Sequence, residues 1–190
     1  MTSLKKIMLY AATAALFNCG GKTTSQSAEN LVNAKAPVEI SEFGPLEVGA
    51  DYKSYTKVNT ESFPSPTHGK RFVDVYVNDI GLAAYLNDEA QMPTGTVVVK
   101  TSKETQDGKA TDVDGPIFVM EKREEGFDSK SNDWWYALHW EDVPESWQAK
   151  VGGEKVYWKT PEKKVGYCIS CHANYDRELG GVPAELLIRP

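Results

Sequence analysis

Two cysteines and a histidine near the end of the chain have the types and the spacing needed to attach and ligate a haem. Cys168 and Cys171 are separated by two residues, and His172 follows directly. Thiols at this spacing form thioethers with the two vinyl groups of a haem, and the adjoining histidine binds the iron as its proximal ligand. The motif therefore predicts one covalently attached haem c.

Three other interpretations of these residues stay open. Cys168 and Cys171 can close a small structural disulfide loop, or they can form a thioredoxin-like redox pair. Such a redox pair is expected at a strand-to-helix turn in a βαβ unit, and nothing upstream has that pattern. A zinc site needs four ligands, whereas the remaining histidines, His68 and His139, are remote in the sequence. We therefore favour the haem.

The beginning of the chain indicates export. Lys5 and Lys6 precede an apolar run over residues 7–17, which is typical of a secretory signal and too short to cross a bilayer. Haem c is normally attached outside the bacterial cytoplasm, so export and the haem motif agree. We expect residues 1–18 to be a signal peptide.

Cys19 is a candidate for lipidation. Residues 16–20 read Leu-Phe-Asn-Cys-Gly and are similar to a bacterial lipobox, in which the cysteine is acylated and becomes the first mature residue. Asn18 departs from that pattern, because a small residue usually precedes the cysteine. The alternative is ordinary cleavage to a soluble periplasmic form. We expect a periplasmic lipoprotein anchored to the membrane by lipid.

The segment after Cys19 has the composition of a tether. Residues 20–38 contain no aromatic residue and few large apolar ones, so burial there offers little to offset the entropy of ordering. We therefore divide the mature chain into a lipidated cysteine with a flexible tether, residues 19–45, and one haem domain, residues 46–190.

The domain itself is predicted to consist mainly of strands. Residues 71–77, 117–122 and 133–140 are rich in β-branched and aromatic residues, and residues 96–100 are apolar on both faces, as in a central strand. Large rings occupy both faces of residues 133–140. One face is therefore expected to meet the core and the other a haem or a subunit partner.

Two short helices are expected beside these strands. Residues 80–86 have apolar positions at helical spacing, and Asn78 or Asp79 can cap their N-terminus. A second helix is expected to carry His172 and to continue through residues 175–178. A turn-rich stretch is predicted between the strands at 96–100 and 117–122.

Several short motifs follow one another in a fixed order along residues 50–175. They are Tyr55 with Val58-Asn59, His68-Gly69, Val75-Tyr-Val-Asn78, Pro93-Thr-Gly-Thr96, Val98-Val-Lys100, Phe118-Val-Met-Glu-Lys122, Asp133-Trp-Trp-Tyr-Ala137 and Cys168-x-x-Cys-His172. In this order they resemble the cytochrome P-460 family, which also contains the β-type cytochromes c-prime.

The resemblance implies a fold and a cofactor. Members of the family are mostly antiparallel β-sheet proteins with flanking helices, and they are often homodimers. Each subunit holds one high-spin haem c whose distal side is open. We therefore expect an α+β fold, mainly an antiparallel sheet with a few short helices, and a homodimer.

The resemblance also singles out Lys100. In the hydroxylamine-oxidising members a lysine is cross-linked to a haem meso carbon, and Lys100 stands at the matching place in the segment Pro-x-Gly-Thr-x-x-x-Lys. The β-type cytochromes c-prime lack this cross-link and bind small gases. Thr101 stands where family members often have an acidic residue, which leaves the subtype open. The alternative for Lys100 is a strand-end lysine that reaches water.

The sixth coordination position decides between catalysis and electron transfer, because an axial methionine or second histidine leaves no vacant site. We expect Met120 to be a core residue, as is usual for a methionine within a strand, and Met92 is the other mature methionine. We expect His68 to stabilise its loop and His139 to face solvent. The expectation is therefore an open distal site.

Three functions follow from an open haem. The first is oxidation of hydroxylamine or another nitrogen oxide, with electrons passed to a partner such as a soluble cytochrome. A distal carboxylate would help as general base, for which Glu121, Asp128 and Asp133 are available by type. The second is binding of NO or CO without turnover, which an apolar wall at Phe118 would favour. The third is plain electron transfer.

Charge excludes one class of partner. The chain has a formal net charge of −6, and it shows no basic patch interleaved with aromatic residues. Proteins that bind nucleic acid neutralise its phosphates with such patches. We therefore expect no nucleic-acid partner.

Overall fold

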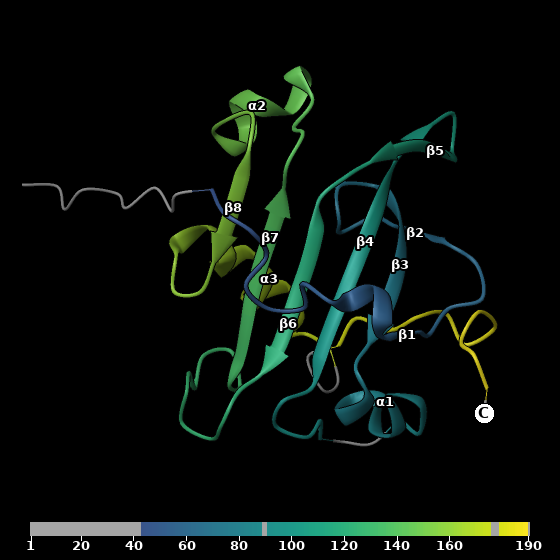
Figure 1. Ribbon diagram of the computed structural model, residues 1–190, viewed down its shortest axis with the longest axis vertical. Helices are drawn as coiled ribbons and strands as arrows, with labels where there is room; N and C mark the ends of the chain where they lie inside the picture. The colour runs from purple at the N-terminus through teal and green to yellow at the C-terminus, as the bar shows by residue number, and fades with distance from the viewer. Residues whose placement is uncertain (1–42, 89–90, 176–178, 190) are drawn as a thin grey trace, which may run out of the picture. The chain divides into compact units, whose positions relative to one another are not determined.

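The computed structural model describes residues 43–88, 91–175 and 179–189. Together they form an antiparallel sheet of eight strands with three short α-helices (Figure 1). The strands are β1 (Thr56–Lys57), β2 (Phe63–Ser65), β3 (Arg71–Val77), β4 (Val97–Gln106), β5 (Lys109–Asp114), β6 (Ile117–Lys122), β7 (Trp134–Trp140) and β8 (Val156–Lys159). The helices are α1 (Asp79–Leu86), α2 (Glu145–Val151) and α3 (Gly166–His172), with 3-10 turns η1 (Tyr52–Ser54) and η2 (Lys163–Val165). The predicted α+β fold is confirmed.

The sheet is ordered β1-β3-β4-β6-β7-β8, with β2 added to β3 and β5 added to β4. The predicted central strand lies at the centre, because β4 pairs with both β3 and β6. The four residues Val97–Lys100 at its start are all buried. This explains why the segment is apolar on both faces.

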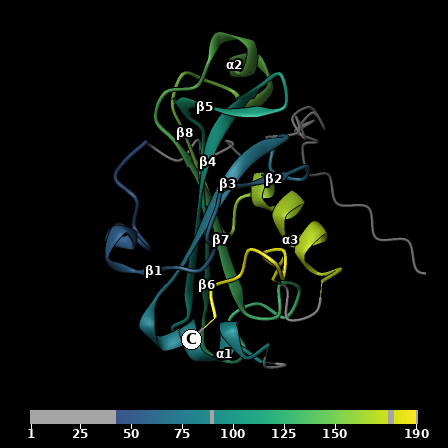
Figure 2. The ribbon, with the colours of Figure 1, turned by 90° about the vertical axis from the view of Figure 1, so that its right-hand side faces the viewer.

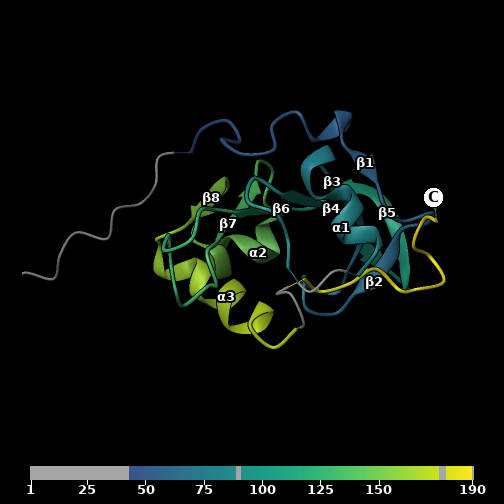
Figure 3. The same ribbon diagram turned by 90° about the horizontal axis from the view of Figure 1, so that it is seen from below.

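Both faces of the sheet are covered. The segment Phe43–Tyr55 lies against one face, where its apolar side chains pack on Val99 and Trp135. Helix α3 and residues 179–189 lie against the other face (Figures 2 and 3). In β3 the alternate residues beginning with Val73 point to this second face and are buried there. The C-terminal segment therefore closes a core on the side of the sheet that carries α3.

The stretch predicted to be rich in turns is a β-hairpin. Strand β4 extends to Gln106 and pairs with β5 through a two-residue connection, Asp107-Gly108. Both connecting residues have left-handed backbone, with φ of 51° and 76°, as short hairpin connections require. Most of β5 is exposed. The hairpin is absent from the sequence prediction because exposed strands lack the apolar alternation on which that prediction depends.

Helix α1 confirms the helix predicted at residues 80–86. The side chain of Asn78 caps it by accepting a hydrogen bond from the backbone N–H of Gly81 at 3.2 Å. The same amide accepts from the N–H of Val97 at 3.0 Å and donates to the carbonyl of Gly95 at 2.9 Å. Asn78 therefore ties the start of α1 to the start of β4.

Helix α3 ends earlier in the chain than predicted. It carries His172 as expected, but it ends there, and residues 173–175 form turns. The predicted continuation over residues 176–178 falls outside the described residues, as do the signal peptide, Cys19 and residues 20–42 of the tether. Within the described ranges, no helix combines the length and the apolar character that a membrane span requires.

Candidate haem-binding site

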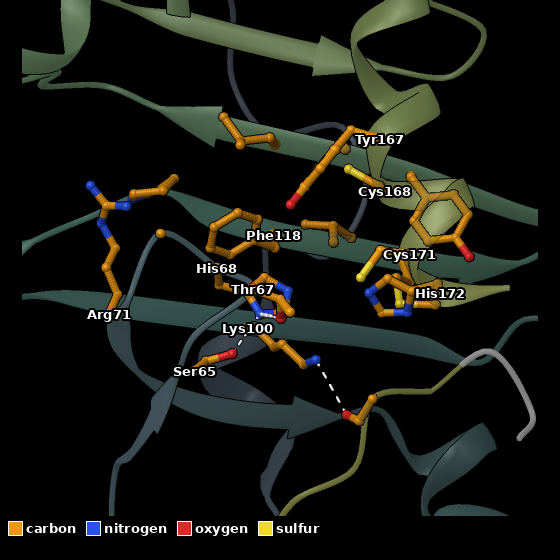
Figure 4. A pocket seen from close by; sticks show the side chains of 18 of the residues that line it. Ser65, Thr67, His68, Arg71, Lys100, Phe118, Tyr167, Cys168, Cys171 and His172 are labelled. Carbon is orange, nitrogen blue, oxygen red and sulfur yellow. Dashed lines mark hydrogen bonds between the residues drawn. The ribbon is translucent and has the colours of Figure 1, made fainter. Parts of the chain in front are cut away.

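A cavity of about 710 Å³ lies between the sheet and helix α3 (Figure 4). Its described walls are mainly apolar and aromatic, with contributions from β4, β6, β7 and α3. Four cationic side chains also line it, and they are Arg71, Lys100, Lys150 and Lys164. None of the described lining residues is an aspartate or a glutamate.

The predicted haem-attachment residues share one wall of this cavity. Cys168, Cys171 and His172 lie at positions i, i+3 and i+4 of α3, which places them on the same side of a helix. Both cysteines are free and half-buried, and His172 is buried. Burial raises the pKa of the Cys168 thiol to about 11, with a further contribution from Cys171. Cys168 therefore faces the cavity as a neutral thiol at pH 7.

The alternatives for these residues receive no support from the geometry. The thiols of Cys168 and Cys171 are not joined in a disulfide. Among the described residues, no three histidine, cysteine or acidic side chains gather into a group that would hold a metal ion, as a zinc site would require. Helix α3 follows the 3-10 turn η2 and is not preceded directly by a strand as in a βαβ redox motif.

Lys100 points into the same cavity. It is only 7% exposed, and its Nζ donates a hydrogen bond to the carbonyl oxygen of Gly180 at 3.3 Å (Figure 4). Burial lowers the pKa of its amine to about 8, and the nearby Cys171 opposes this shift. The alternative of a strand-end lysine that reaches water is therefore wrong. A buried amine therefore lines the same cavity as the haem motif.

His68 enters the cavity from the turn after β2. Its Nδ1 lies 2.7 Å from the hydroxyl of Ser65, so the histidine stabilises its loop as predicted. Its ring also packs edge-on against Phe118, with 4.6 Å between ring centroids, and lies 6.3 Å from the ring of His172. Burial lowers the pKa of His68 to about 3, with smaller contributions from Lys100 and His172. A neutral imidazole therefore faces His172.

The other residues considered for the distal side occupy different places. Met120 lines the cavity as a buried core residue, as predicted, and Met92 is buried in the same apolar cluster. The prediction for His139 is wrong, because its Nε2 lies 2.9 Å from the carbonyl oxygen of Gly44 and its ring packs on Phe43. The segment that covers this face of the sheet leaves His139 half-buried and bonded to the backbone.

The three candidate carboxylates lie outside the cavity lining. Glu121 pairs with Arg123 at 2.5 Å. Asp133 accepts a hydrogen bond from the backbone N–H of Asp128, and Asp128 accepts one from that of Lys130. These aspartates therefore hold the turn between β6 and β7. Phe118, by contrast, does form part of the cavity wall, as the gas-binding alternative requires.

Arg71 is a cavity residue that the sequence analysis did not single out. Its guanidinium lies 4.7 Å from the ring centroids of both Trp140 and Trp147 and pairs with Glu104 at 2.7 Å. A signal was present in the sequence. Arg71 lies on the same face of β3 as the buried valines. A charged side chain on a buried face usually has an ion-pair partner or a function.

The lining suits a haem. A haem is a flat, largely apolar macrocycle with vinyl groups at one side and two anionic propionates at the other. The cavity offers apolar and aromatic walls, two free thiols beside an imidazole, and cations without carboxylates among its described lining residues. Figure 4 shows Arg71 on the opposite side of the cavity from Cys168 and Cys171. Cys168, Cys171 and His172 would hold the group.

The fold and the cavity together define a class of protein, in which an antiparallel sheet and a C-terminal Cys-x-x-Cys-His helix enclose a cofactor site. The family model for Cytochrome P460 matches residues 49–178, which is more than half of the chain. The chain therefore belongs to the cytochrome P460 family. This confirms the resemblance seen in the sequence, and membership implies a haem cofactor. No curated protein matches the chain.

Proposed function

We propose that this protein is an exported mono-haem c protein that binds hydroxylamine or nitric oxide at the haem iron and oxidises the bound ligand. One observation carries the proposal. The residues for covalent haem attachment, Cys168, Cys171 and His172, line the same apolar cavity as the buried amine of Lys100. That combination supports a modified, catalytically competent haem more than a simple electron carrier.

Each of these side chains has a definite task in the proposal. Cys168 and Cys171 would hold the haem through thioether bonds to its vinyl groups, and the imidazole of His172 would bind its iron. The carbonyl of Gly180 holds the amine of Lys100 at the cavity, where it is the candidate for the haem cross-link. A haem in this place supplies an iron that accepts a small nitrogen ligand and releases electrons one at a time. A soluble cytochrome is the proposed acceptor of those electrons.

A second candidate function is binding of NO or CO without turnover, as in the β-type cytochromes c-prime. Phe118 on the cavity wall and the lack of a carboxylate among the described lining residues favour it. Oxidation of hydroxylamine releases protons, and a nearby carboxylate would accept them. Electron transfer alone is a third candidate, and it predicts an iron that does not respond to added ligands.

The absorption spectrum of the ferrous holoprotein separates these functions. The protein is produced in an exporting host that attaches haem c, and carbon monoxide or hydroxylamine with an electron acceptor is then added. A strongly red-shifted Soret band together with turnover supports the cross-linked oxidase. An ordinary haem c spectrum that responds to CO without hydroxylamine turnover supports gas binding. A spectrum that ignores CO and NO contradicts both, and purification without haem contradicts the proposal as a whole.

Export and lipidation form a separate part of the proposal and rest on the sequence alone. We propose that residues 1–18 are removed and that Cys19 is acylated. Mass spectrometry of the purified membrane form is expected to find the acyl mass on Cys19. The variant Cys19→Ser is expected to lose both the mass and the membrane association. A free Cys19 thiol in the wild type would contradict the anchor.

A further inference from the structure

Arg71 is a buried cation in the cavity wall. Of the four cationic side chains that line the cavity, Arg71 and Lys100 are buried, whereas Lys150 and Lys164 are exposed. The amine of Lys100 is bonded to the backbone of Gly180. Figure 4 shows Arg71 on the opposite side of the cavity from the cysteines of α3. A fixed positive charge therefore lies in the wall that faces the haem motif.

The chain satisfies only part of the guanidinium of Arg71. Its Nε and Nη2 both donate to Oε1 of Glu104, at 3.1 and 2.7 Å. Within the described residues, the third nitrogen, Nη1, makes no hydrogen bond, and surrounding atoms do not fully enclose it. A guanidinium directs its N–H donors along more than one edge and can therefore bind two carboxylates. Nη1 is available to an anion in the cavity.

The surroundings of the guanidinium hold it in place at the cavity. The rings of Trp140 and Trp147, which also line the cavity, both have centroids 4.7 Å from Cζ of Arg71. Two glycines leave the space that the group occupies. A Cβ at Gly69 would lie 2.0 Å from Nη1, and a Cβ at Gly115 would lie 2.8 Å from Nε. Stacking and close packing therefore orient the donor before any ligand binds.

The chemistry of a haem indicates which anion this donor receives. The vinyl groups and the propionates of a haem lie at opposite edges of the macrocycle. When Cys168 and Cys171 hold the vinyl edge, the propionates are directed toward the wall that carries Arg71. None of the described lining residues is an aspartate or a glutamate, so no carboxylate of that lining repels a propionate. Carboxylates are the groups that a guanidinium binds most strongly in proteins.

We propose that Arg71 anchors a haem propionate, which accepts a hydrogen bond from Nη1 while Glu104 holds the other edge of the guanidinium. The inference deepens the proposed function and rests on haem attachment at Cys168 and Cys171. Thioether bonds fix one edge of the group, and Arg71 fixes the opposite edge. Arg71 is thus a positioning residue for the haem plane. Its positive charge also favours the ferrous over the ferric iron.

Resonance Raman spectroscopy of the holoprotein tests the anchor at the propionate itself. The bending mode of a haem propionate moves to higher frequency when its carboxylate accepts a hydrogen bond. In Arg71→Met this mode is expected at a lower frequency than in the wild type. Equal frequencies in the two proteins would overturn the proposal. Haem content and circular dichroism show whether each variant is loaded and folded.

Arg123→Met is the matched control for the Raman experiment. Arg123 also pairs with a glutamate, Glu121, and its Cζ lies 5.8 Å from the ring centroid of Trp135, but it does not line the cavity. Its propionate mode is expected at the wild-type frequency. A mode that falls as far in Arg123→Met as in Arg71→Met would count against a specific anchor at Arg71.

Glu104→Gln separates anchoring from a purely structural role of Arg71. It removes the ion pair but leaves the guanidinium at the cavity, so stability should fall while the propionate mode keeps its frequency. An equal fall of the mode in Glu104→Gln and Arg71→Met would contradict the anchor. If Arg71→Met alone fails to fold, adding Glu104→Gln removes the unpaired carboxylate. The double variant should then show the lowered frequency.

The reduction potential is an independent measurement. Loss of the Arg71 charge beside the propionates should stabilise the ferric haem, so Arg71→Met is expected to have a lower potential than the wild type. Arg123→Met removes the same charge outside the cavity lining and should change the potential less. Equal changes of the potential in these two variants would contradict a position of Arg71 at the haem.

A free inorganic anion is the alternative occupant with the same chemistry, and sulfate is the probe for it. The wild-type holoprotein is expected to show no saturable sulfate binding in calorimetry, because the propionate fills the site. Saturable binding that Arg71→Met abolishes, together with an unchanged propionate mode, would assign the site to a free anion and overturn the anchor.

The outcomes separate this inference from the proposed function. A lowered propionate mode in Arg71→Met, with a wild type that binds neither NO nor hydroxylamine, supports the anchor and contradicts the proposed function. An unchanged mode in Arg71→Met, with a wild type that oxidises hydroxylamine, contradicts the anchor and supports the proposed function.

Discussion

The amine of Lys100 donates a hydrogen bond to the carbonyl oxygen of Gly180, at 3.3 Å, and thereby joins the central strand to the C-terminal segment. Lys100 is 7% exposed, so this bond satisfies a charge that would otherwise be costly to bury. The amine also lies near Cys171, which opposes the lowering of the Lys100 pKa by burial. The position of the amine is therefore determined by β4 and by the segment after α3 together.

Replacement of Lys100 by methionine tests its role in the haem spectrum. Methionine has a similar length and is apolar, so Lys100→Met should leave the haem attached through Cys168 and Cys171. We expect the red-shifted Soret band to become that of an ordinary haem c and hydroxylamine turnover to be lost. Absorption spectroscopy and mass spectrometry of haem peptides measure the two effects.

Lys103→Met is the control for this prediction. Lys103 lies on the same strand, its side chain is 40% exposed, and it pairs with Asp114 on the surface. The spectrum and the turnover should be those of the wild type. An unchanged spectrum in Lys100→Met would show that the wild-type haem carries no cross-link at this residue.

The strands with large apolar residues were predictable from the sequence, but the way in which the side chains of the site come together was not. Strand β3 shows the alternation of buried and half-buried residues that a sheet imposes. The site depends on register, because Lys100 is paired with Phe118 across β4 and β6. A slip of one residue would turn these side chains to the other face. The strand register depends on contacts between residues that are distant in the sequence. So does the turn that brings His68 to Phe118.

Arg71 is expected to stabilise the fold through Glu104 and two tryptophans. Its side chain is 3% exposed and bonds Oε1 of Glu104 through both Nε and Nη2, at 3.1 and 2.7 Å. Lysine cannot reproduce this fork or the stacking on Trp140 and Trp147. Arg71→Lys should lower the free energy of unfolding by about 1–3 kcal/mol, measured by urea denaturation.

Arg189→Lys is the matched control, because Arg189 is exposed near the end of the described chain. It should change the free energy of unfolding by less than about 0.5 kcal/mol. A loss of stability in Arg71→Lys no larger than in this control would show that the buried guanidinium contributes nothing beyond its charge.

Asp74 is expected to make stability depend on acid pH. Burial by itself would raise its pKa, but hydrogen bonds from Lys57, Asn59 and Ser62 outweigh burial and hold the pKa below the usual 3.8. A carboxyl group with a lowered pKa stabilises the folded state above its unfolded pKa, and that contribution is lost as pH falls through the folded pKa. The contribution of Asp74 to the free energy of unfolding should therefore be fully present at pH 7 and decline below pH 4.

Asp74→Asn tests this dependence. At pH 7 the variant should lose about 1 kcal/mol of unfolding free energy, a low value because the carboxylate is partly exposed. The difference from the wild type should shrink as urea denaturation is repeated at lower pH. Asp142→Asn, at an exposed aspartate, should show no difference at any pH. A constant difference for Asp74→Asn across the acid range would contradict the assigned contribution.

Gly81 is expected to be required where α1 meets β4. A Cβ at this position would lie 2.3 Å from Cγ2 and 2.8 Å from Oγ1 of Thr96. Thr96 is fully buried, and its hydroxyl donates to the carbonyl of Pro93 at 2.7 Å, so it has no room to move aside. Alanine has the higher helix propensity by about 1 kcal/mol, yet overpacking costs about 1–3 kcal/mol.

Gly81→Ala should therefore destabilise the protein in thermal or urea unfolding in spite of the better helix former. Ala83→Gly, at an exposed position of the same helix, measures propensity alone and should cost about 1 kcal/mol. Adding Thr96→Ser removes Cγ2 but keeps the hydroxyl, so the double variant with Gly81→Ala should recover part of the loss. If Gly81→Ala proves more stable than the wild type, the close approach of α1 to β4 does not constrain this position.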